Sequence, residues 1–220
     1  MRAEEGKQEA VNTERVADSF RIAVFASGNG SNFQALVDAV AAGKLNVTIE
    51  LLVCDRPQAA VIQRAQKAGI DVFAFRPKEY ASREAYETEI VRELDRRGID
   101  LIVLAGYMRI LTETIVNPYY GRMINIHPSL LPSFPGVRAI EQAWEHGVKT
   151  TGVTVHYVDG GLDSGPIITQ RPVEVREEDT LETLETAIHA VEHELLPYTV
   201  GLISAGRVRL EDRRVYIARV

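Results

Sequence analysis

The sequence predicts an α/β fold, a doubly wound and mostly parallel sheet with helices on both faces. Short apolar runs, of the kind buried on both faces of a parallel sheet, alternate with segments of helical periodicity. A glycine-rich loop follows the first of these runs and leads directly into a helix. No internal repeat or low-complexity linker divides the chain, so we expect a single domain over residues 21–220 after a flexible extension over residues 1–20.

The first expected elements are a strand, a glycine loop and a helix. The strand covers residues 21–26, the loop covers 27–32, and apolar residues then recur at helical spacing from 33 to 40. We expect Asn32 to cap this helix at its N-terminus and Gly43 to end it.

The same alternation continues to the end of the chain. Further strands are expected at 47–54, 72–75, 101–105, 123–127, 151–157 and 167–175. Further helices are expected at 59–68, 82–98 and about 181–205, and a terminal strand pair at 208–220. Strands that alternate with helices in this way pack as a parallel sheet.

Composition and charge exclude several classes of protein. The 220 residues are 45% hydrophobic and 25% charged, as in soluble globular proteins. The formal net charge is -6 and no dense block of Lys and Arg occurs, so we expect no nucleic-acid partner. No apolar segment is long enough to span a bilayer and no secretory core is present, so we expect no membrane partner and a cytoplasmic location. The single cysteine, Cys54, lies in an apolar run and is expected to be a buried structural thiol.

A strand that ends in an amide and an imidazole marks the expected functional site. Asn125 and His127 are two residues apart on the strand 123–127, so their side chains point to the same side. Pro128 and Pro132 then stop regular structure and stiffen the exit. Ligands of open α/β sheets usually bind at the carboxyl ends of strands. Spacing alone leaves two interpretations open, a catalytic histidine and a buried structural one.

The glycine loop before the first helix favours a phosphate ligand. Glycines allow close approach of a ligand, and the exposed N–H groups at a helix N-terminus favour an anion. Gly28 and Gly30 resemble a dinucleotide fingerprint, but Phe33 occupies the third glycine position, so a nicotinamide site is disfavoured. An ordinary βα turn is the alternative.

A second glycine-dense loop, 159–166, contains Asp159 and Asp163. Such a loop is often only a turn. An aspartate packed near His127 would favour the imidazolium form, which suits a general acid near neutral pH.

A zinc site also has to be considered at His189 and His193. With Glu192 between them they match the inverted zinc-peptidase motif on an expected helix. Little chain follows to supply a third ligand, so we expect no metal. The alternative is a solvated or ligand-facing helix edge.

Four motifs together resemble the folate-dependent phosphoribosylglycinamide formyltransferase family, which has a Rossmann-like formyltransferase fold. They lie in the segments 27–32, 104–111, 125–132 and, in two parts, 152–157 with 162–166. The resemblance runs from about Arg21 to the C-terminus, with the motifs in the family's order. Two positions depart from the family pattern, because Ser164 stands where Gly is common and Tyr107 where Phe is common.

The resemblance implies a formyl transfer in de novo purine biosynthesis. The formyl group would pass from 10-formyltetrahydrofolate, a co-substrate, to the amine of 5'-phosphoribosylglycinamide, with no metal. The family's catalytic residues would fall on Asn125, His127 and Asp163. Its ribonucleotide contacts would fall on Gly30, Ser31, Asn32 and Glu192. Its folate contacts would fall on Arg83, Met108, Arg109, Ile110, Leu111 and again Asn125.

Related activities remain as alternatives. A methionyl-tRNA formyltransferase would need a further RNA-binding domain and a basic surface, and neither is expected here. A formyltetrahydrofolate deformylase would need an N-terminal regulatory domain, for which residues 1–20 are too few. Another folate-dependent formyltransferase, or a non-catalytic folate- or nucleotide-binding module, stays open because a fold does not determine function. The expected partners are small molecules, and the sequence leaves the oligomeric state open, a homodimer included.

Overall fold

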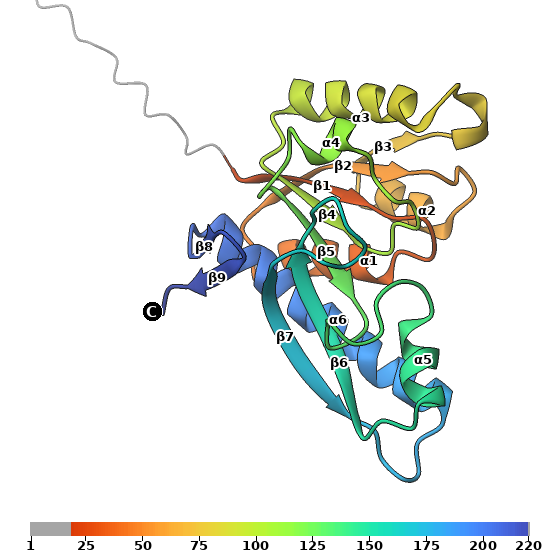
Figure 1. Cartoon of the computed structure of the whole chain (residues 1–220). Coiled ribbons are helices and arrows are strands. Elements are labelled where there is room, and N and C mark those ends of the chain that lie inside the picture. The colour runs from red at the N-terminus through yellow and green to blue at the C-terminus, as the bar shows by residue number, and fades with distance from the viewer. Residues whose placement is uncertain (1–18, 220) are drawn as a thin grey trace, which may run out of the picture.

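A seven-stranded sheet forms the centre of the computed structural model, which describes residues 19–219 (Figure 1). Its strand order is β3-β2-β1-β4-β5-β6-β7. The strands are β1 (Arg21–Phe25), β2 (Thr48–Cys54), β3 (Asp71–Ala74), β4 (Leu101–Leu104), β5 (Met123–His127), β6 (Thr150–Tyr157) and β7 (Ile167–Glu174). β1 to β5 run parallel, whereas β6 is antiparallel to both of its neighbours. The prediction of a mostly parallel sheet is confirmed, and the expected N-terminal extension lies almost wholly outside the described residues.

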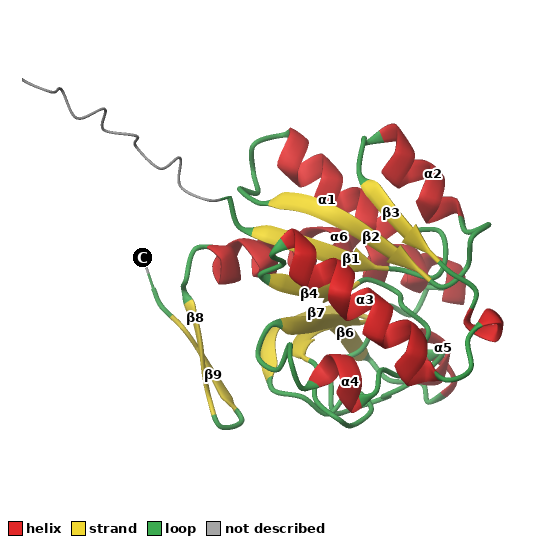
Figure 2. Cartoon of the chain, turned by 90° about the horizontal axis from the view of Figure 1, so that it is seen from above, coloured by secondary structure: helices red, strands yellow, loops and turns green. Residues whose placement is uncertain are grey.

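Helices cover both faces of this sheet. They are α1 (Ser31–Ala41), α2 (Ala60–Lys67), α3 (Arg83–Arg97), α4 (Glu113–Val116), α5 (Ala139–Glu145), α6 (Leu181–Ser204) and the short 3-10 helix η1 (Pro77–Glu79). A separate hairpin of β8 (Val208–Glu211) and β9 (Arg214–Ile217) projects from the body, as Figure 2 shows, and confirms the expected terminal strand pair. No helix within residues 19–219 combines the length and the apolar character needed to cross a bilayer.

Two apolar cores lie on opposite faces of the sheet, because successive strand residues point to opposite faces. Ile22 and Val24 of β1 face a core shared with α1, α2 and α6. Ala23 and Phe25 of the same strand face a core shared with α3 and α4. Cys54 is fully buried in the first core, as predicted.

The start of α1 differs from the prediction. Gly30, and not Asn32, occupies the N-cap position, with φ 77, and the helix begins at Ser31. This left-handed conformation costs glycine little, and a Cβ at position 30 would overlap the side chain of Val61. The predicted cap at Asn32 is therefore wrong, whereas Gly43 does follow the last turn with φ 67.

Three short helical segments, η1, α4 and α5, were not predicted. Each has seven residues or fewer, too short for a helical repeat of apolar residues to be recognisable. α5 follows the turn in which Arg138 adopts φ 59. Each of these segments lies in the stretch of chain that follows a parallel strand, after β3, β4 and β5 respectively.

Candidate active site

The carboxyl end of β5 brings together the three residues expected to be catalytic. Asp163, from the loop between β6 and β7, places Oδ2 3.5 Å from Nδ1 of His127. Asn125 donates from Nδ2 to Oδ1 of the same carboxylate at 3.3 Å. The side chains of His127 and Asp163 are only 6% and 11% exposed, so solvent screens their interaction weakly.

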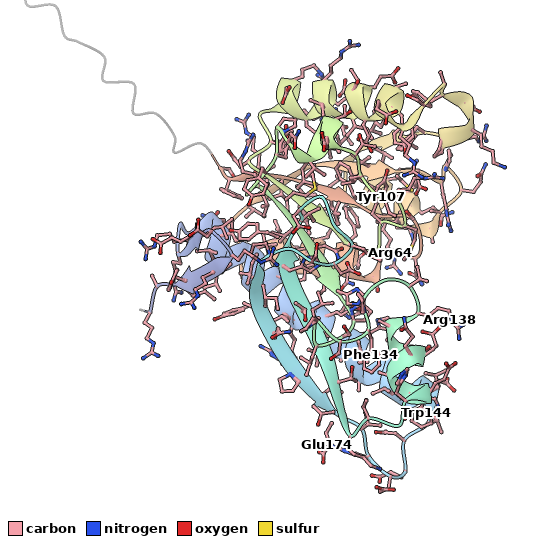
Figure 3. The ribbon with its side chains drawn as sticks, in the orientation of Figure 1. Arg64, Tyr107, Phe134, Arg138, Trp144 and Glu174 are labelled. Carbon is pink, nitrogen blue, oxygen red and sulfur yellow. The ribbon has the colours of Figure 1, made fainter. Side chains whose placement is uncertain are left out.

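The ring of His127 has an acceptor at each nitrogen. Nε2 lies 2.8 Å from the carbonyl oxygen of Phe134, on the loop between β5 and α5 (Figure 3). A carbonyl oxygen can only accept, so Nε2 carries a hydrogen. Nδ1 faces the Asp163 carboxylate at 3.5 Å.

A second histidine, His156, orients Asn125. Nδ1 of His156 donates to the carbonyl oxygen of Tyr157 at 2.8 Å, so in the neutral ring Nε2 is an acceptor. The amide nitrogen of Asn125 lies 3.1 Å from this Nε2 and 3.3 Å from Asp163, so its two hydrogens are shared between them. The opposite orientation of the Asn125 amide would turn its oxygen toward the Asp163 carboxylate, and two acceptors would then face each other.

Asp163 is held as a carboxylate by its surroundings. Burial alone would raise its pKa, but His156 in its protonated form, the N–H of Gly136 and the ring of His127 together keep the pKa below its usual range. The Gly136 N–H donates to Oδ2 at 2.7 Å. The loop 132–136, which follows β5, is therefore bonded to the loop 159–166 that carries this carboxylate.

The loop that carries Asp163 is held from two sides. Within the loop, Asp159 accepts hydrogen bonds from the N–H of Gly161 at 3.0 Å and from Ser164 Oγ at 2.7 Å. From outside, Arg213 in the turn between β8 and β9 donates to the carbonyl oxygen of Ser164 at 2.6 Å. Ser164, one of the two departures from the family pattern, thus contributes a hydrogen bond that Gly could not form.

Tyr107, the other departure, packs against the apolar core. Its ring meets that of Phe25 edge to face, with 5.3 Å between centroids. Its hydroxyl is buried and has no hydrogen-bond partner within residues 19–219, and burial raises its pKa.

The residues expected to bind the ribonucleotide lie where α1 packs against α6. Ser31 and His193 line one groove of about 960 Å³ between these helices. Oδ1 of Asn32 and Nε2 of His193 are buried and, in the described part of the chain, lack a hydrogen-bond partner. Most buried polar atoms have a hydrogen-bond partner, so these two atoms are candidates for contact with a ligand. Glu192 is buried and accepts from His189 Nδ1 at 2.8 Å, a contact that raises the pKa of His189.

Arg64 of α2, labelled in Figure 3, forms hydrogen bonds with the glycine loop. It donates to the carbonyl oxygen of Asn29 at 2.8 Å and to the side-chain oxygen of Asn29 at 2.6 Å. The loop before Ser31 is therefore fixed in place.

The expected folate segment, 108–111, is fixed at its start by a buried aspartate. Asp55 accepts from Ser27 Oγ at 2.6 Å and from Arg109 Nε at 2.8 Å. Ser27 Oγ in turn accepts from the N–H of Met108 at 2.9 Å. This network joins the glycine loop to the folate segment, and the sequence analysis missed Asp55, although it directly follows the buried strand β2.

A second buried carboxylate fixes the other end of this segment. Glu87 of α3 is fully buried and accepts from the N–H and the Oγ1 of Thr112, and burial raises its pKa. Arg83 is the first residue of the same helix. Between the two anchors, Met108 and Ile110 are 64% and 66% exposed, so the segment presents an apolar surface beside the site.

The described residues offer no metal centre. The rings of His189 and His193 are stacked, with 6.5 Å between centroids, and His189 is already bonded to Glu192. Within residues 19–219, no group of three or more His, Cys, Asp or Glu side chains is arranged to hold an ion.

A family model described as formyl transferase matches residues 20–200. This match covers most of the chain, which therefore belongs to the formyl transferase family.

Individual relatives show which members of the formyl transferase family this chain resembles most. The phosphoribosylglycinamide formyltransferase of Bacillus subtilis (strain 168) is 51% identical over 180 residues, which span 82% of this chain and 92% of the relative. The crystal structure of glycinamide ribonucleotide transformylase 1 from Symbiobacterium toebii has a TM-score of 0.88 at 43% identity, covering 91% of this chain and 95% of that one. Within the family, the chain groups with the phosphoribosylglycinamide formyltransferases.

The deformylase alternative shares the fold at lower identity. A formyltetrahydrofolate deformylase from Pseudomonas syringae pv. tomato has a TM-score of 0.85 at 29% identity. The match covers 92% of this chain but 67% of the deformylase.

Proposed function

We propose that this chain transfers the formyl group of 10-formyltetrahydrofolate to the amine of 5'-phosphoribosylglycinamide, giving formylglycinamide ribonucleotide and tetrahydrofolate. The observation that supports this most strongly is the meeting of Asn125, His127 and Asp163 at the end of β5. The identity to a phosphoribosylglycinamide formyltransferase favours this function over a deformylase.

The ribonucleotide would bind at the start of α1. The N–H groups of Ser31 and Asn32 lie in the first turn, where the helix dipole favours a phosphate. The buried Oδ1 of Asn32, which has no hydrogen-bond partner among residues 19–219, and the carboxylate of Glu192 would accept hydrogen bonds from the sugar or the amine. Anchoring the phosphate in this way positions the amine for attack.

The folate would lie against the opposite side of the site. Met108 and Ile110 offer exposed apolar surface, and Leu162, 60% exposed, contributes more from the Asp163 loop. Arg83 and Arg109 would face the carboxylates of the folate, because planar guanidinium groups pair well with carboxylates.

The chemistry requires donors for a developing negative charge. The amine attacks the formyl carbon, a carbon–nitrogen bond forms, and the formyl oxygen becomes an anion. To donate to this oxygen, the Asn125 amide and the His127 ring would each exchange one of their present contacts for the substrate. Loss of one such donor typically costs about 3 to 4 kcal/mol. Collapse breaks the bond to N10 of the folate, which takes up a proton while the new amide nitrogen loses one. Asp163 would keep His127 cationic and relay these protons. The proposed reaction uses no metal.

Turnover measured with both substrates tests this proposal. We expect formylglycinamide ribonucleotide as the product and a loss of kcat/KM of at least about one hundredfold in His127→Ala, since one donor is removed. Asn32→Ala is expected mainly to raise the KM for the ribonucleotide. Formate release without ribonucleotide would instead identify a deformylase, and unchanged turnover in His127→Ala would remove the catalytic assignment.

A further inference from the structure

The C-terminal hairpin of β8 and β9 reaches the loop 159–166, which we call the Asp163 loop. Arg213 lies in the turn of this hairpin and donates from Nη2 to the carbonyl oxygen of Ser164 at 2.6 Å. Its Nη1 lies 3.8 Å from Oδ2 of Asp159. Ser164 directly follows Asp163 in the chain. One side chain from a distant element therefore contacts the Asp163 loop at two points, one of them next to the carboxylate of the site.

The hairpin itself is fixed to the body of the molecule. Three of its apolar side chains pack against the first apolar core, those of Val208, Leu210 and Val215. β9 also contacts β7, the last strand of the large sheet. At the base of the hairpin, the guanidinium group of Arg207 donates to the carbonyl oxygen of Ala218 at 2.7 Å. The turn that carries Arg213 is thus supported from the core.

The Asp163 loop has little apolar packing of its own. Half of its residues are exposed, namely Gly160, Gly161, Leu162 and Ser164. A segment of this kind is held mainly by its hydrogen bonds. At position 163 the backbone adopts φ 49, a left-handed conformation that the surroundings of a residue other than glycine must maintain. We therefore expect the Asp163 side chain to move if the contact to the neighbouring carbonyl group is lost.

Such a movement would take the site apart. Oδ2 of Asp163 lies 3.5 Å from Nδ1 of His127, and Oδ1 accepts from Asn125 at 3.3 Å. A displacement of about 1 Å would lengthen the Asn125 contact beyond the range of a hydrogen bond. Small displacements of a catalytic group are costly even when their cause lies far from the reacting atoms.

We propose that Arg213 is a positioning residue, which holds the Asp163 loop so that the carboxylate faces His127 and Asn125. This inference rests on the proposed function, and Arg213 acts through the loop and not on the substrates. A hydrogen bond from a guanidinium group is charge-assisted, but the Arg213 side chain is 71% exposed, so its contribution is modest. We expect its loss to lower kcat by about threefold to tenfold.

Steady-state rates of Arg213→Ala with both substrates test the inference. kcat should fall by about threefold to tenfold, whereas the KM for the ribonucleotide should change by less than about twofold, because that substrate would bind at the start of α1. Arg213→Lys keeps the charge and a donor, and its kcat should lie between those of the wild type and Arg213→Ala. Arg214→Ala is the matched control and should keep the wild-type kcat. It removes the same charge one residue further on, and within residues 19–219 the Arg214 side chain forms no hydrogen bond or ion pair.

Hydrogen–deuterium exchange gives a second measurement that does not depend on turnover. The N–H of Gly161 donates to Oδ1 of Asp159 at 3.0 Å, and Asp159 is also the partner of Arg213. Exchange in a peptide that covers 159–165 should be faster in Arg213→Ala than in the wild type or Arg214→Ala. Thermal unfolding of each variant checks that the rest of the fold is intact.

The outcomes separate this inference from the function on which it rests. An unchanged kcat in Arg213→Ala, an equal loss in Arg214→Ala, or unaltered exchange in the Asp163 loop would overturn the inference and leave the proposed function standing. A loss that appears only as a raised KM for the ribonucleotide would also overturn it. Absence of turnover in the wild-type protein would overturn the proposed function, and the role of Arg213 in catalysis with it.

Discussion

Replacing Asp163 with Asn tests how the site depends on one negative charge. The exchange keeps the shape of the side chain, and Asn tolerates the left-handed backbone, φ 49, as well as Asp does. The carboxylate accepts from Gly136 and Asn125 and faces Nδ1 of His127. An amide keeps one accepting oxygen, so its NH₂ must face at least one of these donors.

The size of the effect follows from the separation of the charges. Two unit charges 3.5 Å apart, the distance from His127 Nδ1 to Asp163 Oδ2, interact by about 5 kcal/mol at an effective dielectric constant of about 20. Relaxation and water will recover part of this, and we expect a loss of about 3 to 4 kcal/mol. That corresponds to a decrease in kcat/KM of roughly one hundredfold to one thousandfold. In the proposed mechanism the His127 ring acts on the formyl oxygen as it becomes an anion, so the loss should appear mainly in kcat.

Steady-state rates with both substrates provide the assay, and Asp159→Asn provides the control. Asp159 lies in the same loop and receives the same chemical change, but its hydrogen bonds go to Gly161 and Ser164. We expect less than a tenfold decrease for this variant. If Asp163→Asn retained more than a tenth of the wild-type kcat/KM, or fell no further than Asp159→Asn, the role of the Asp163 charge would be refuted.

Three further outcomes follow from the packing of the described residues. Gly30→Ala should lower the free energy of unfolding by about 2 to 5 kcal/mol in chemical denaturation, because it forces a left-handed L-residue against Val61; a wild-type value would contradict the assigned backbone. The hydrogen bond to Glu192 raises the pKa of His189, so its stabilising contribution is complete below the unfolded pKa and is lost as pH rises through the folded one. His189→Gln should thus lower the Tm by roughly 1 to 3 °C near pH 5.5 and hardly at all near pH 9, and an equal loss at both would disprove the linkage. Burial raises the pKa of the Cys54 thiol, so a thiol reagent should label it only after unfolding, and rapid labelling of the native protein would count against its burial.

The sequence by itself determined the class of fold and placed two of the expected site residues on one face of a strand. Buried strands and amphipathic helices have different periods, so the order of the long elements could be predicted from hydrophobic spacing alone. Asn125 and His127 share a face because alternate strand residues do so whatever surrounds them. Local spacing encodes properties of this kind.

Only the tertiary structure decided how distant segments meet. Gly30 occupies the cap position, and only the folded chain shows that a side chain there would overlap Val61 of α2. Asp55 accepts a hydrogen bond from Arg109, which is 54 residues away in the sequence. This bond fixes the segment 108–111, whose own sequence pattern predicts neither helix nor strand. Such contacts depend on the order of the strands and on the shape of the loops between them. Hydrophobic periodicity describes one helix or strand at a time. It cannot predict a carboxylate that bonds to two loops, because those loops come together only in the folded chain.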